Sequence, residues 1–359
     1  MQSTVFRRKF RGASPYKGDL ENMGKVSAFL KRKNVLFSAK RYGIDAMGAM
    51  AQGLFASLLI GTIIKTLGQQ LNVQFLIDAG NFAQQVAGPA MAVSIGAALS
   101  AAGASYQAMF RNPMVSPDLL GASTGAGFGA ALGLLFGLGY GAITGLSFGF
   151  GLLAVLLAYL ISRVSKIQTT LAMVLAGVMI SSLFTSGTSF IKLVADPTDQ
   201  LPAITYWLMG SLTSIKARDV QFAVLPILVG LIPLWLLRWR VNLLTVSEAE
   251  ARSMGVDTTR LRVVVVLCAT LMTAGSVAIS GMIGWVGLVI PHFGRMIFGQ
   301  DYRRLLPASS LLGATFLMVV DNLARTITTS EIPLGILTSF VGAPVFLYLI
   351  LSGGTQRGD

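Results

Sequence analysis

The sequence predicts an all-α, polytopic membrane protein of about ten transmembrane helices with both termini in the cytoplasm. Hydrophobic residues make up 53% of the 359 residues and charged residues only 12%, whereas an ordinary soluble domain is about 25% charged. So few charges cannot cover a soluble surface. Two further observations support the prediction: apolar runs of membrane-spanning length recur along the chain, and Lys and Arg gather in alternate gaps between them.

Ten apolar runs qualify as spans, because a membrane-crossing helix needs about 20 mostly apolar residues. The run at 284–298 is short and contains Pro291, which predicts a broken or tilted helix. The ten predicted spans are 47–67, 82–104, 119–138, 141–162, 170–192, 220–237, 262–281, 284–298, 305–322 and 333–351.

The charges orient these spans. With the N-terminus inside, the inner segments carry 23 of the 28 Lys and Arg residues and the outer segments carry 5. This asymmetry is typical of cytoplasmic loops on a membrane protein. It places a basic tail (1–45) and a short tail (353–359) in the cytoplasm, and it explains the net charge of +13 without a nucleic-acid partner.

Two connections are too long to be simple turns. The outer one, 193–219, is semi-apolar and predicts a short helix lying at the outer face. The inner one contains "SEAEARSMG", in which Ser247 and Glu250 form a capping box and Gly255 ends a short helix. A short helix exposed on the cytoplasmic side suggests a docking element, the alternative being a capped connector.

The stretch "RNPMVSPDLLGASTGAGFGAALG" poses a choice between a phosphate-binding loop and a packed helix. It lacks the lysine of a Walker loop and the acidic residue of a dinucleotide-binding turn. Glycines four residues apart instead form one ridge along a helix, which lets membrane helices approach closely. We predict a turn at Asn112, Pro113 and Pro117, followed by a helix that packs through Gly121, Gly125, Gly129 and Gly133.

Side chains suited to metal or covalent chemistry are scarce. Cys268 is the single cysteine and His292 the single histidine, which argues against a disulfide framework and a metal centre. His292 follows Pro291 and is interpreted as a hydrogen-bonded residue at a kink rather than a proton relay. We therefore expect no catalytic residues, no cofactor and no bound metal.

Several ordered segments resemble FecCD-type permeases, the membrane subunits of ABC importers for ferric siderophores, heme and cobalamin. They include "FRNPMVSPDLLGASTGAGFG", "ITYWLMGSL", "SEAEARSMGVDTTRLR", "GWVGLVIPHFGRMIFGQDYRRLLP" and "EIPLGILTSFVGAPVFLYLI", and together they cover about residues 96–352. The resemblance implies a type II ABC importer permease fold. It also implies a transport subunit that is not an enzyme, because a separate partner hydrolyses ATP.

The beginning of the chain departs from that pattern. Family members usually enter the second span through two arginines, whose positions here fall on Gln85 and Gly88. Residues 24–95 instead resemble the start of a phosphotransferase-system-like IIC membrane protein, so the chain is interpreted as a possible fusion or chimera. The predicted division has four parts: a tail at 1–45, two atypical spans at 46–95, the permease domain at 96–352 and a tail at 353–359. The second atypical span continues to about residue 104.

The resemblance also assigns roles to residues. The inner helix matches the element that couples a permease to its ATPase, and the span 170–192 matches the wall and inner gate of the translocation path. The coupling residues would be Glu248, Glu250, Ala251, Arg252, Met254 and Gly255; the gate and path residues would be Thr169, Thr170, Leu171, Ser181, Ser182 and Thr185. For the hydroxyl residues the alternative is hydrogen bonding within the helix bundle.

Arg325 matches a position that docks an outer binding protein, the alternative being a headgroup anchor. Without the two expected arginines, docking would be weaker or would use Lys192, Lys216 or Arg218. Asp321 would cap its helix or pair with Arg325, four residues on.

The implied partners are a second permease copy, an ABC ATPase dimer, a substrate-binding protein and the lipid of a bacterial or archaeal inner membrane. Two alternatives to the importer remain: a phosphotransferase-type sugar carrier component, suggested by the N-terminal residues, and a fusion product without transport activity. The cargo is expected to be a ferric siderophore or a related chelate such as heme or cobalamin, with molybdate-type oxyanions as an alternative.

Overall fold

The computed structural model describes residues 69–70, 74, 87–165, 169–213, 215–246, 248–328 and 331–353. Apart from isolated helical positions at 69–70 and 74, these residues form α-helices and short 3-10 helices, and no strand occurs among them. The elements are α4 (Ala87–Phe110), η2 (Pro117–Leu120), α5 (Ala122–Leu135), α6 (Tyr140–Val164), α7 (Thr169–Val194), α8 (Gln200–Met209), α9 (Ala217–Leu236), α10 (Arg238–Asn242), η3 (Leu243–Thr245), α11 (Glu248–Ser253), α12 (Thr258–Ser280), α13 (Val286–Phe298), α14 (Tyr302–Thr326) and α15 (Leu334–Gly353).

The predicted spans correspond to these helices. Six described helices are long and apolar enough to cross a membrane, and three shorter apolar helices, α5, α13 and α15, occupy three further predicted spans. The predicted span 47–67, the tail 1–45 and Ser247 lie outside the described residues. The two long connections each contain a predicted short helix, α8 and α11. The all-α membrane fold is therefore confirmed.

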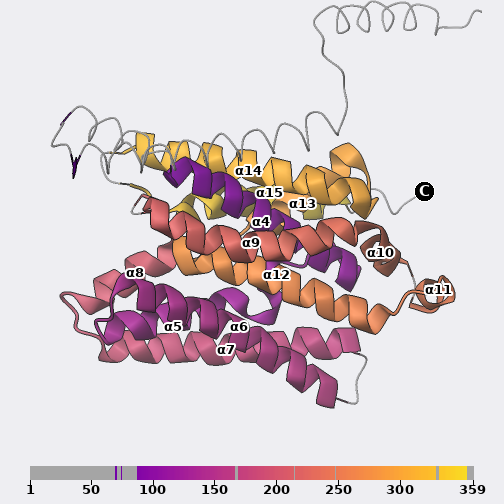
Figure 1. Cartoon of the computed structure of the whole chain (residues 1–359), viewed down its shortest axis with the longest axis horizontal. Coiled ribbons are helices and arrows are strands. Elements are labelled where there is room, and N and C mark those ends of the chain that lie inside the picture. The colour runs from indigo at the N-terminus through magenta and orange to yellow at the C-terminus, as the bar shows by residue number, and fades with distance from the viewer. Residues whose placement is uncertain are drawn as a thin grey trace, which may run out of the picture. The chain divides into compact units, whose positions relative to one another are not determined.

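The helices form two groups joined by α12. In the first, α9, α12, α13 and α14 pack around α4; in the second, α5, α6 and α7 pack against one another, and α8 packs on α5. Helix α12 contacts both groups, since it packs on α4 and α9 and also on α5 and α6 (Figure 1). The inner and outer predicted loops lie at opposite ends of these helices, with α10 and α11 at one end and α8 at the other.

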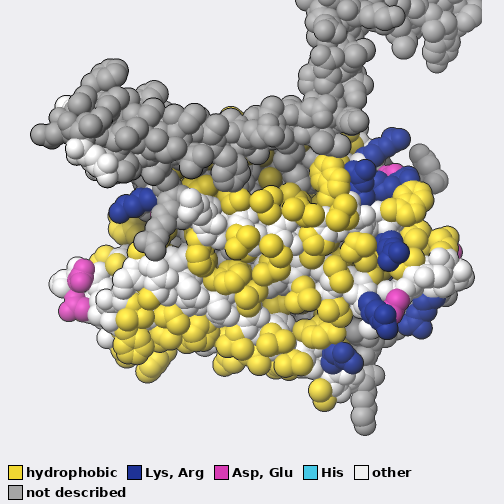
Figure 2. All heavy atoms as spheres, in the orientation of Figure 1, with side chains coloured by type: hydrophobic (Ala, Val, Ile, Leu, Met, Phe, Trp, Pro, Cys, Tyr) yellow, Lys and Arg dark blue, Asp and Glu magenta, His cyan; other side chains and the backbone are white. Residues whose placement is uncertain are grey.

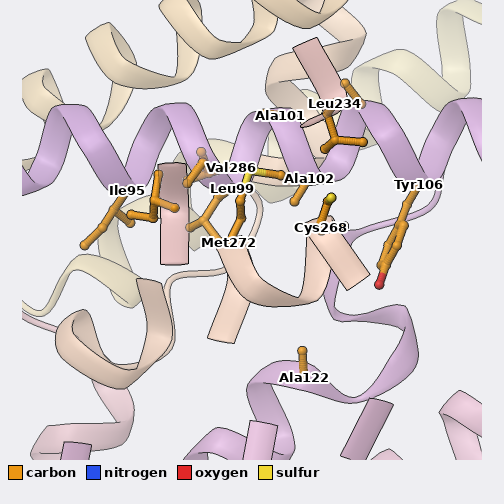
Figure 3. Close-up of a cluster of buried hydrophobic side chains, with 14 of the residues drawn as sticks. Ile95, Leu99, Ala101, Ala102, Tyr106, Ala122, Leu234, Cys268, Met272 and Val286 are labelled. Atoms are coloured by element: carbon orange, nitrogen blue, oxygen red, sulfur yellow. The ribbon is translucent and has the colours of Figure 1, made fainter. Parts of the chain in front are cut away.

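Helix α4 is buried on nearly all sides, which its small residues make possible. Figure 3 shows Ile95, Leu99 and Ala102 of α4 meeting Met272 of α12 and Val286 of α13. Lipid tails are as apolar as these side chains, so membrane helices associate through close packing rather than through exclusion of water. The small side chains of α4 therefore determine how closely its neighbouring helices can pack against it.

Glycines mark the closest crossings. A Cβ on Gly96 would overlap the carbonyl of Gly313 in α14, and a Cβ on Gly103 would overlap the backbone of Gly287 in α13. Two buried hydroxyl contacts, Ser105 Oγ to Tyr302 Oη (2.7 Å) and Tyr106 Oη to Thr270 Oγ1 (3.3 Å), complete this core. The first group is thus fixed by backbone-to-backbone contact together with a few hydrogen bonds.

The predicted turn after α4 is present. Arg111 takes a left-handed φ of 51°, and the Asn112 side-chain oxygen accepts the Met114 amide at 2.9 Å, which is the turn chemistry favoured by asparagine. Pro117 opens η2, where its missing amide hydrogen costs nothing. The chain then reverses into α5.

Candidate coupling and translocation site

Helix α11 is a short, sharply terminated element. Gly255 has a left-handed φ of 78°, its amide binds the Arg252 carbonyl at 2.9 Å, and the Val256 amide binds the Ala251 carbonyl at 3.2 Å. This pair of bonds is a Schellman motif, which glycine permits because it lacks a Cβ. The placement of Gly255 agrees with the helix end that the sequence predicts.

The side chains of α11 divide into an anchor and an exposed face. Ala251 is 1% exposed, and the helix contacts η3 and α12. Glu250, Arg252 and Met254 are exposed, whereas the side chain of Glu248 lies outside the described residues. The helix therefore rests on the bundle through Ala251 and presents charged and apolar groups outward.

Two hydrogen-bonded links connect α11 to long helices. Asp257 caps α12 by accepting the amides of Thr259 and Arg260, both at 3.1 Å, so the N-cap of α12 lies two residues after the helix-ending glycine. On the other side, Arg111 Nη1 donates to the Val246 carbonyl at 3.3 Å. The segments that flank α11 are thus tied to the start of α12 on one side and to the end of α4 on the other.

Beneath Arg111, a buried glutamine joins three segments. Gln107 Nε2 donates to the carbonyl oxygens of Val115 (3.0 Å) and Leu288 (3.3 Å), and Arg295 Nη1 donates to Gln107 Oε1 at 2.7 Å. Gln107 is 3% exposed, so each of these bonds replaces one that water cannot supply. The cluster holds α4, the turn before η2, and α13 together.

Helix α7 has one packed face and one face that no described residue covers. Its packed face meets α5, α6 and η2. Thr170 is half-buried at the start of the helix, and Leu171 is 51% exposed; the side chain of Thr169 lies outside the described residues. The exposed positions are Leu171, Leu175, Val178, Met179, Ser182, Leu183, Thr185, Ser186, Ser189, Phe190, Leu193 and Val194.

Three of the four exposed hydroxyl groups on this face, those of Ser182, Thr185 and Ser189, are hydrogen-bonded within the helix. Ser182 Oγ donates to the Val178 carbonyl (2.9 Å), and Thr185 Oγ1 donates to the Ser181 carbonyl (2.8 Å). Each hydroxyl keeps acceptor lone pairs but has no free hydrogen. The face is therefore uncharged and mixed in character, with exposed apolar side chains beside a few hydroxyls and no strong binding group. Ser181 is placed differently, because it is half-buried and its Oγ lies 3.0 Å from the site of a Cβ on Gly121.

The predicted glycine ridge faces α6 at three of its four positions. A Cβ on Gly125 would lie 2.5 Å from the Phe150 carbonyl oxygen, one on Gly129 would overlap that of Leu146, and one on Gly133 would lie 3.1 Å from Ile143 Cγ1. Gly121 instead precedes α5 with a left-handed φ of 85°. The ridge therefore begins at Gly125, and Gly121 serves the turn.

At the α8 end, Arg325 is held by a carboxylate within its own helix. Its Nε and Nη2 atoms donate to the two oxygens of Asp321, each at 3.0 Å, and Asp321 is 0% exposed. The guanidinium also fills the space beside Gly88 on α4. The predicted Asp321–Arg325 pair is present. Nearby, Ser211 Oγ donates to Glu331 at 2.7 Å.

Charged groups lie at the two ends of the helices. Figure 2 shows Lys and Arg gathered at the α10–α11 end, acidic and basic side chains at the α8 end, and hydrophobic side chains over the middle. At the α8 end, hydrogen bonds from Thr198 lower the pKa of Asp196. His292 is half-buried after Pro291 in α13, and Cys268 is buried in α12. Among the described residues, no cluster of His, Cys, Asp or Glu could hold a metal ion.

A family model described as the FecCD transport family matches residues 48–352. The chain belongs to this family. The chain is 40% identical to the molybdate import system permease protein MolB of Haemophilus influenzae over 74% of this chain and 80% of that protein. It is 41% identical to an iron chelatin transport system permease protein of Helicobacter pylori, over 72% and 78% of the two chains.

The fold is shared with a solved ABC transporter structure. An inward-facing conformation of a metal-chelate type ABC transporter superposes with a TM-score of 0.71 at 35% identity, covering 85% of this chain and 99% of that one. The FecCD-family chain is thus a multi-pass membrane permease subunit of an ABC importer, and a transport component rather than an enzyme. Such a permease works with a partner permease and an ATPase.

The family match begins well before residue 96, where the motif resemblance starts. It includes residues 48–95, for which the sequence suggested a IIC-like membrane protein. Residues 1–68 and 75–86 lie outside the described residues. The division into an atypical N-terminal part and a permease domain therefore stays a prediction.

Two features of the site were not predicted from the sequence. These are the Gln107–Arg295 cluster and the Arg111 bond to Val246. The available signal was a polar side chain inside an apolar run, since a buried amide or guanidinium requires partners. That signal identifies Gln107 as unusual, but it does not say which distant carbonyls it binds.

Proposed function

We propose that this chain forms, as a homodimer in the bacterial or archaeal inner membrane, the translocation path for a bulky metal chelate such as a ferric siderophore. A binding protein would deliver the cargo at the α8 end, and the ATPases would dock at the α10–α11 end, which faces the cytoplasm. The observation that carries the proposal is the uncovered face of α7 with its back-bonded hydroxyls.

That face suits a bulky cargo recognised mainly elsewhere. Uncharged hydroxyls and aliphatic groups hold a chelate weakly, and a path must release what it conducts. A small oxyanion would favour cationic groups along the wall, yet the exposed positions of α7 from Leu171 to Phe190 carry none. The iron chelatin permease among the relatives supports a chelate, and the molybdate permease names the alternative to be tested.

The gate would lie where α7 begins. Thr169, Thr170 and Leu171 would close the path at the cytoplasmic end, and Ser182 and Thr185 would line it farther out. Ser181 points toward Gly121, so in this proposal it supports the wall rather than lining it. Arg325 would contribute to docking of the binding protein through the exposed part of its guanidinium, which does not bind Asp321.

Reconstitution tests the function directly. The purified chain, its ATPase and its binding protein are placed in vesicles, and uptake of a ferric siderophore is compared with uptake of molybdate. We expect ATP hydrolysis that increases with the chelate-loaded binding protein, together with chelate uptake. Molybdate uptake without chelate uptake would overturn the cargo, and transport without an ATPase would overturn the importer.

Charge exchange on α11 should uncouple the complex. In the variant Glu250→Lys with Arg252→Glu, the exposed charges keep their sum but reverse their order, so complementary groups on an ATPase would be opposed. We expect transport and ATPase copurification to fall together, by about tenfold for a loss of about 1.4 kcal/mol. The control Asp199→Lys alters a charge at the α8 end. Unchanged copurification would remove α11 from the coupling role.

Cross-linking tests whether two copies meet at α7. In a Cys268→Ser background, a Val178→Cys variant places a thiol on the uncovered face, where the native side chain is 55% exposed. Mild oxidation in membranes should give a disulfide-linked species of twice the mass. A Leu225→Cys variant on α9, where Leu225 is 68% exposed, is expected to stay monomeric. Equal cross-linking at both positions would indicate random collisions.

A further inference from the structure

A second surface lies where α10 meets the start of α14. Its members are one tryptophan, three arginines and one aspartate, and it is called the Trp239 cluster here. Trp239, Arg303 and Asp301 are in contact; the cluster also includes Arg240 and Arg304, the exposed residues that follow Trp239 and Arg303 in the sequence.

Arg303 and Trp239 hold each other in a fixed arrangement. The guanidinium carbon lies 4.2 Å from the centre of the indole ring, and Arg303 Nε donates to both oxygens of Asp301 at 2.8 and 2.9 Å. These hydrogen bonds lower the pKa of Asp301, so it is charged at neutral pH. The Tyr302 amide donates to Asn242 Oδ1 at 2.8 Å and ties α14 to α10. The cluster is therefore preorganised.

The remaining two arginines keep their charge available. Arg240 follows Trp239 and Arg304 follows Arg303, both are exposed, and neither makes an ion pair with a described residue. Three arginines and one aspartate give the cluster a net charge of +2. Exposed guanidinium groups beside a stacked ring form a forked donor surface suited to phosphate oxygens.

The position of the cluster distinguishes lipid from other anions. Helix α9 exposes Leu225, Val229, Ile232 and Leu236 at spacings of three or four residues, which makes one continuous apolar stripe along the helix. Trp239 lies in the next helix, α10, three residues beyond Leu236 in the sequence, and is 61% exposed. Near the start of α14, the end of α13 exposes Met296, Ile297 and Phe298.

Exposed apolar side chains thus approach the cluster on α9 and at the end of α13, and the acyl chains of a bound lipid would need such an apolar surface. Tryptophan is enriched at the boundary between hydrocarbon and water. Arginines just beyond that boundary attract anionic lipid headgroups. A soluble phosphate would use the guanidinium groups but would have no use for the apolar stripe.

We propose that the Trp239 cluster binds the phosphodiester headgroup of an anionic phospholipid, with the acyl chains lying along α9. Arg240 and Arg304 hold the phosphate oxygens, and the Trp239 ring, fixed by Arg303, packs beside the glycerol. The inference is independent of the cargo and of the ATPase partner.

Quenching of tryptophan fluorescence by brominated lipids tests the proposal. The full chain is placed in nanodiscs with brominated phosphatidylglycerol or brominated phosphatidylcholine, and the Trp239 signal is isolated by subtracting a Trp239→Phe variant. We expect the wild-type chain to prefer the anionic lipid by about thirtyfold, since Arg240 and Arg304 near the surface contribute roughly 1 kcal/mol each. The variant Arg240→Gln with Arg304→Gln should reduce the preference to about one.

The control is Arg260→Gln, because Arg260 is exposed at the start of α12 and pairs with Asp257 at 3.0 Å. This variant removes one positive charge outside the cluster and should keep the preference. A preference unchanged in the double variant, or lost equally in the control, would overturn the proposal. Competition by inorganic phosphate that removes the preference would assign the arginines to a soluble anion instead.

Discussion

A Gly96→Val substitution is expected to separate α4 from α14 and to destabilise the whole first helix group. A Cβ at this position would overlap the Gly313 carbonyl and lie 2.9 Å from Leu317 Cβ. Backbone atoms cannot move aside as a flexible side chain can, so the helices must shift. We expect a cost of at least about 3 kcal/mol, seen as a melting temperature in detergent lowered by about 5–10 °C.

The matched control is Gly145→Ala on α6. No atom lies within 4 Å of a Cβ at this position, and alanine favours a helix over glycine by about 1 kcal/mol. The control should therefore melt at or slightly above the wild-type temperature. If Gly96→Val and Gly145→Ala behaved alike, the contact between α4 and α14 would not depend on close backbone approach.

Breaking the Asp321–Arg325 pair is expected to have the second-largest effect. Asp321→Asn leaves a guanidinium that is only 30% exposed without its carboxylate, and Arg325→Gln leaves the fully buried carboxylate without its partner. Removing one member of a buried ion pair costs roughly 3–5 kcal/mol, a figure that the partial exposure of Arg325 reduces. Each single variant should therefore melt well below the wild type.

The double variant Asp321→Asn with Arg325→Gln separates stability from docking. Neither an unpaired charge nor an unmatched donor set remains, so most of the lost stability should return. Thermal unfolding in detergent and binding-protein affinity are measured on the same preparations. Wild-type stability with reduced affinity would assign docking to Arg325. A double variant as unstable as the sum of the single ones would contradict the ion-pair interpretation.

Some elements were predictable because their signals are local. A run such as 170–192 spans the bilayer by length and composition alone, and α7 occupies Thr169–Val194. The helix end at Gly255 and the turn at Asn112 and Pro117 follow from the backbone preferences of those residue types. The glycine ridge followed from spacing, and it packs on α6 from Gly125 onward.

Other features could not be derived from spacing. Gly121 continues the four-residue period, yet it lies before the helix because the 3-10 turn η2 ends there. Ser181 and Ser182 are adjacent hydroxyls that the sequence treats alike, but one meets Gly121 and the other is exposed. A helix rotation of about 100° between neighbours separates their environments, and its phase is set by tertiary packing.

The sequence by itself determined that this chain is a bundle of membrane helices, where most helices begin and end, and which loops carry positive charge. Composition, length and turn chemistry act over a few residues, so they can be interpreted without knowledge of the fold.

Only the tertiary structure decided which helices touch and which groups meet. Helix α4 is apolar and small all round, so it carries no amphipathic stripe to indicate its partners. Its contacts with Gly313 and Gly287, and the meeting of Gln107 with Arg295, arise from shape fitting between segments far apart in the chain.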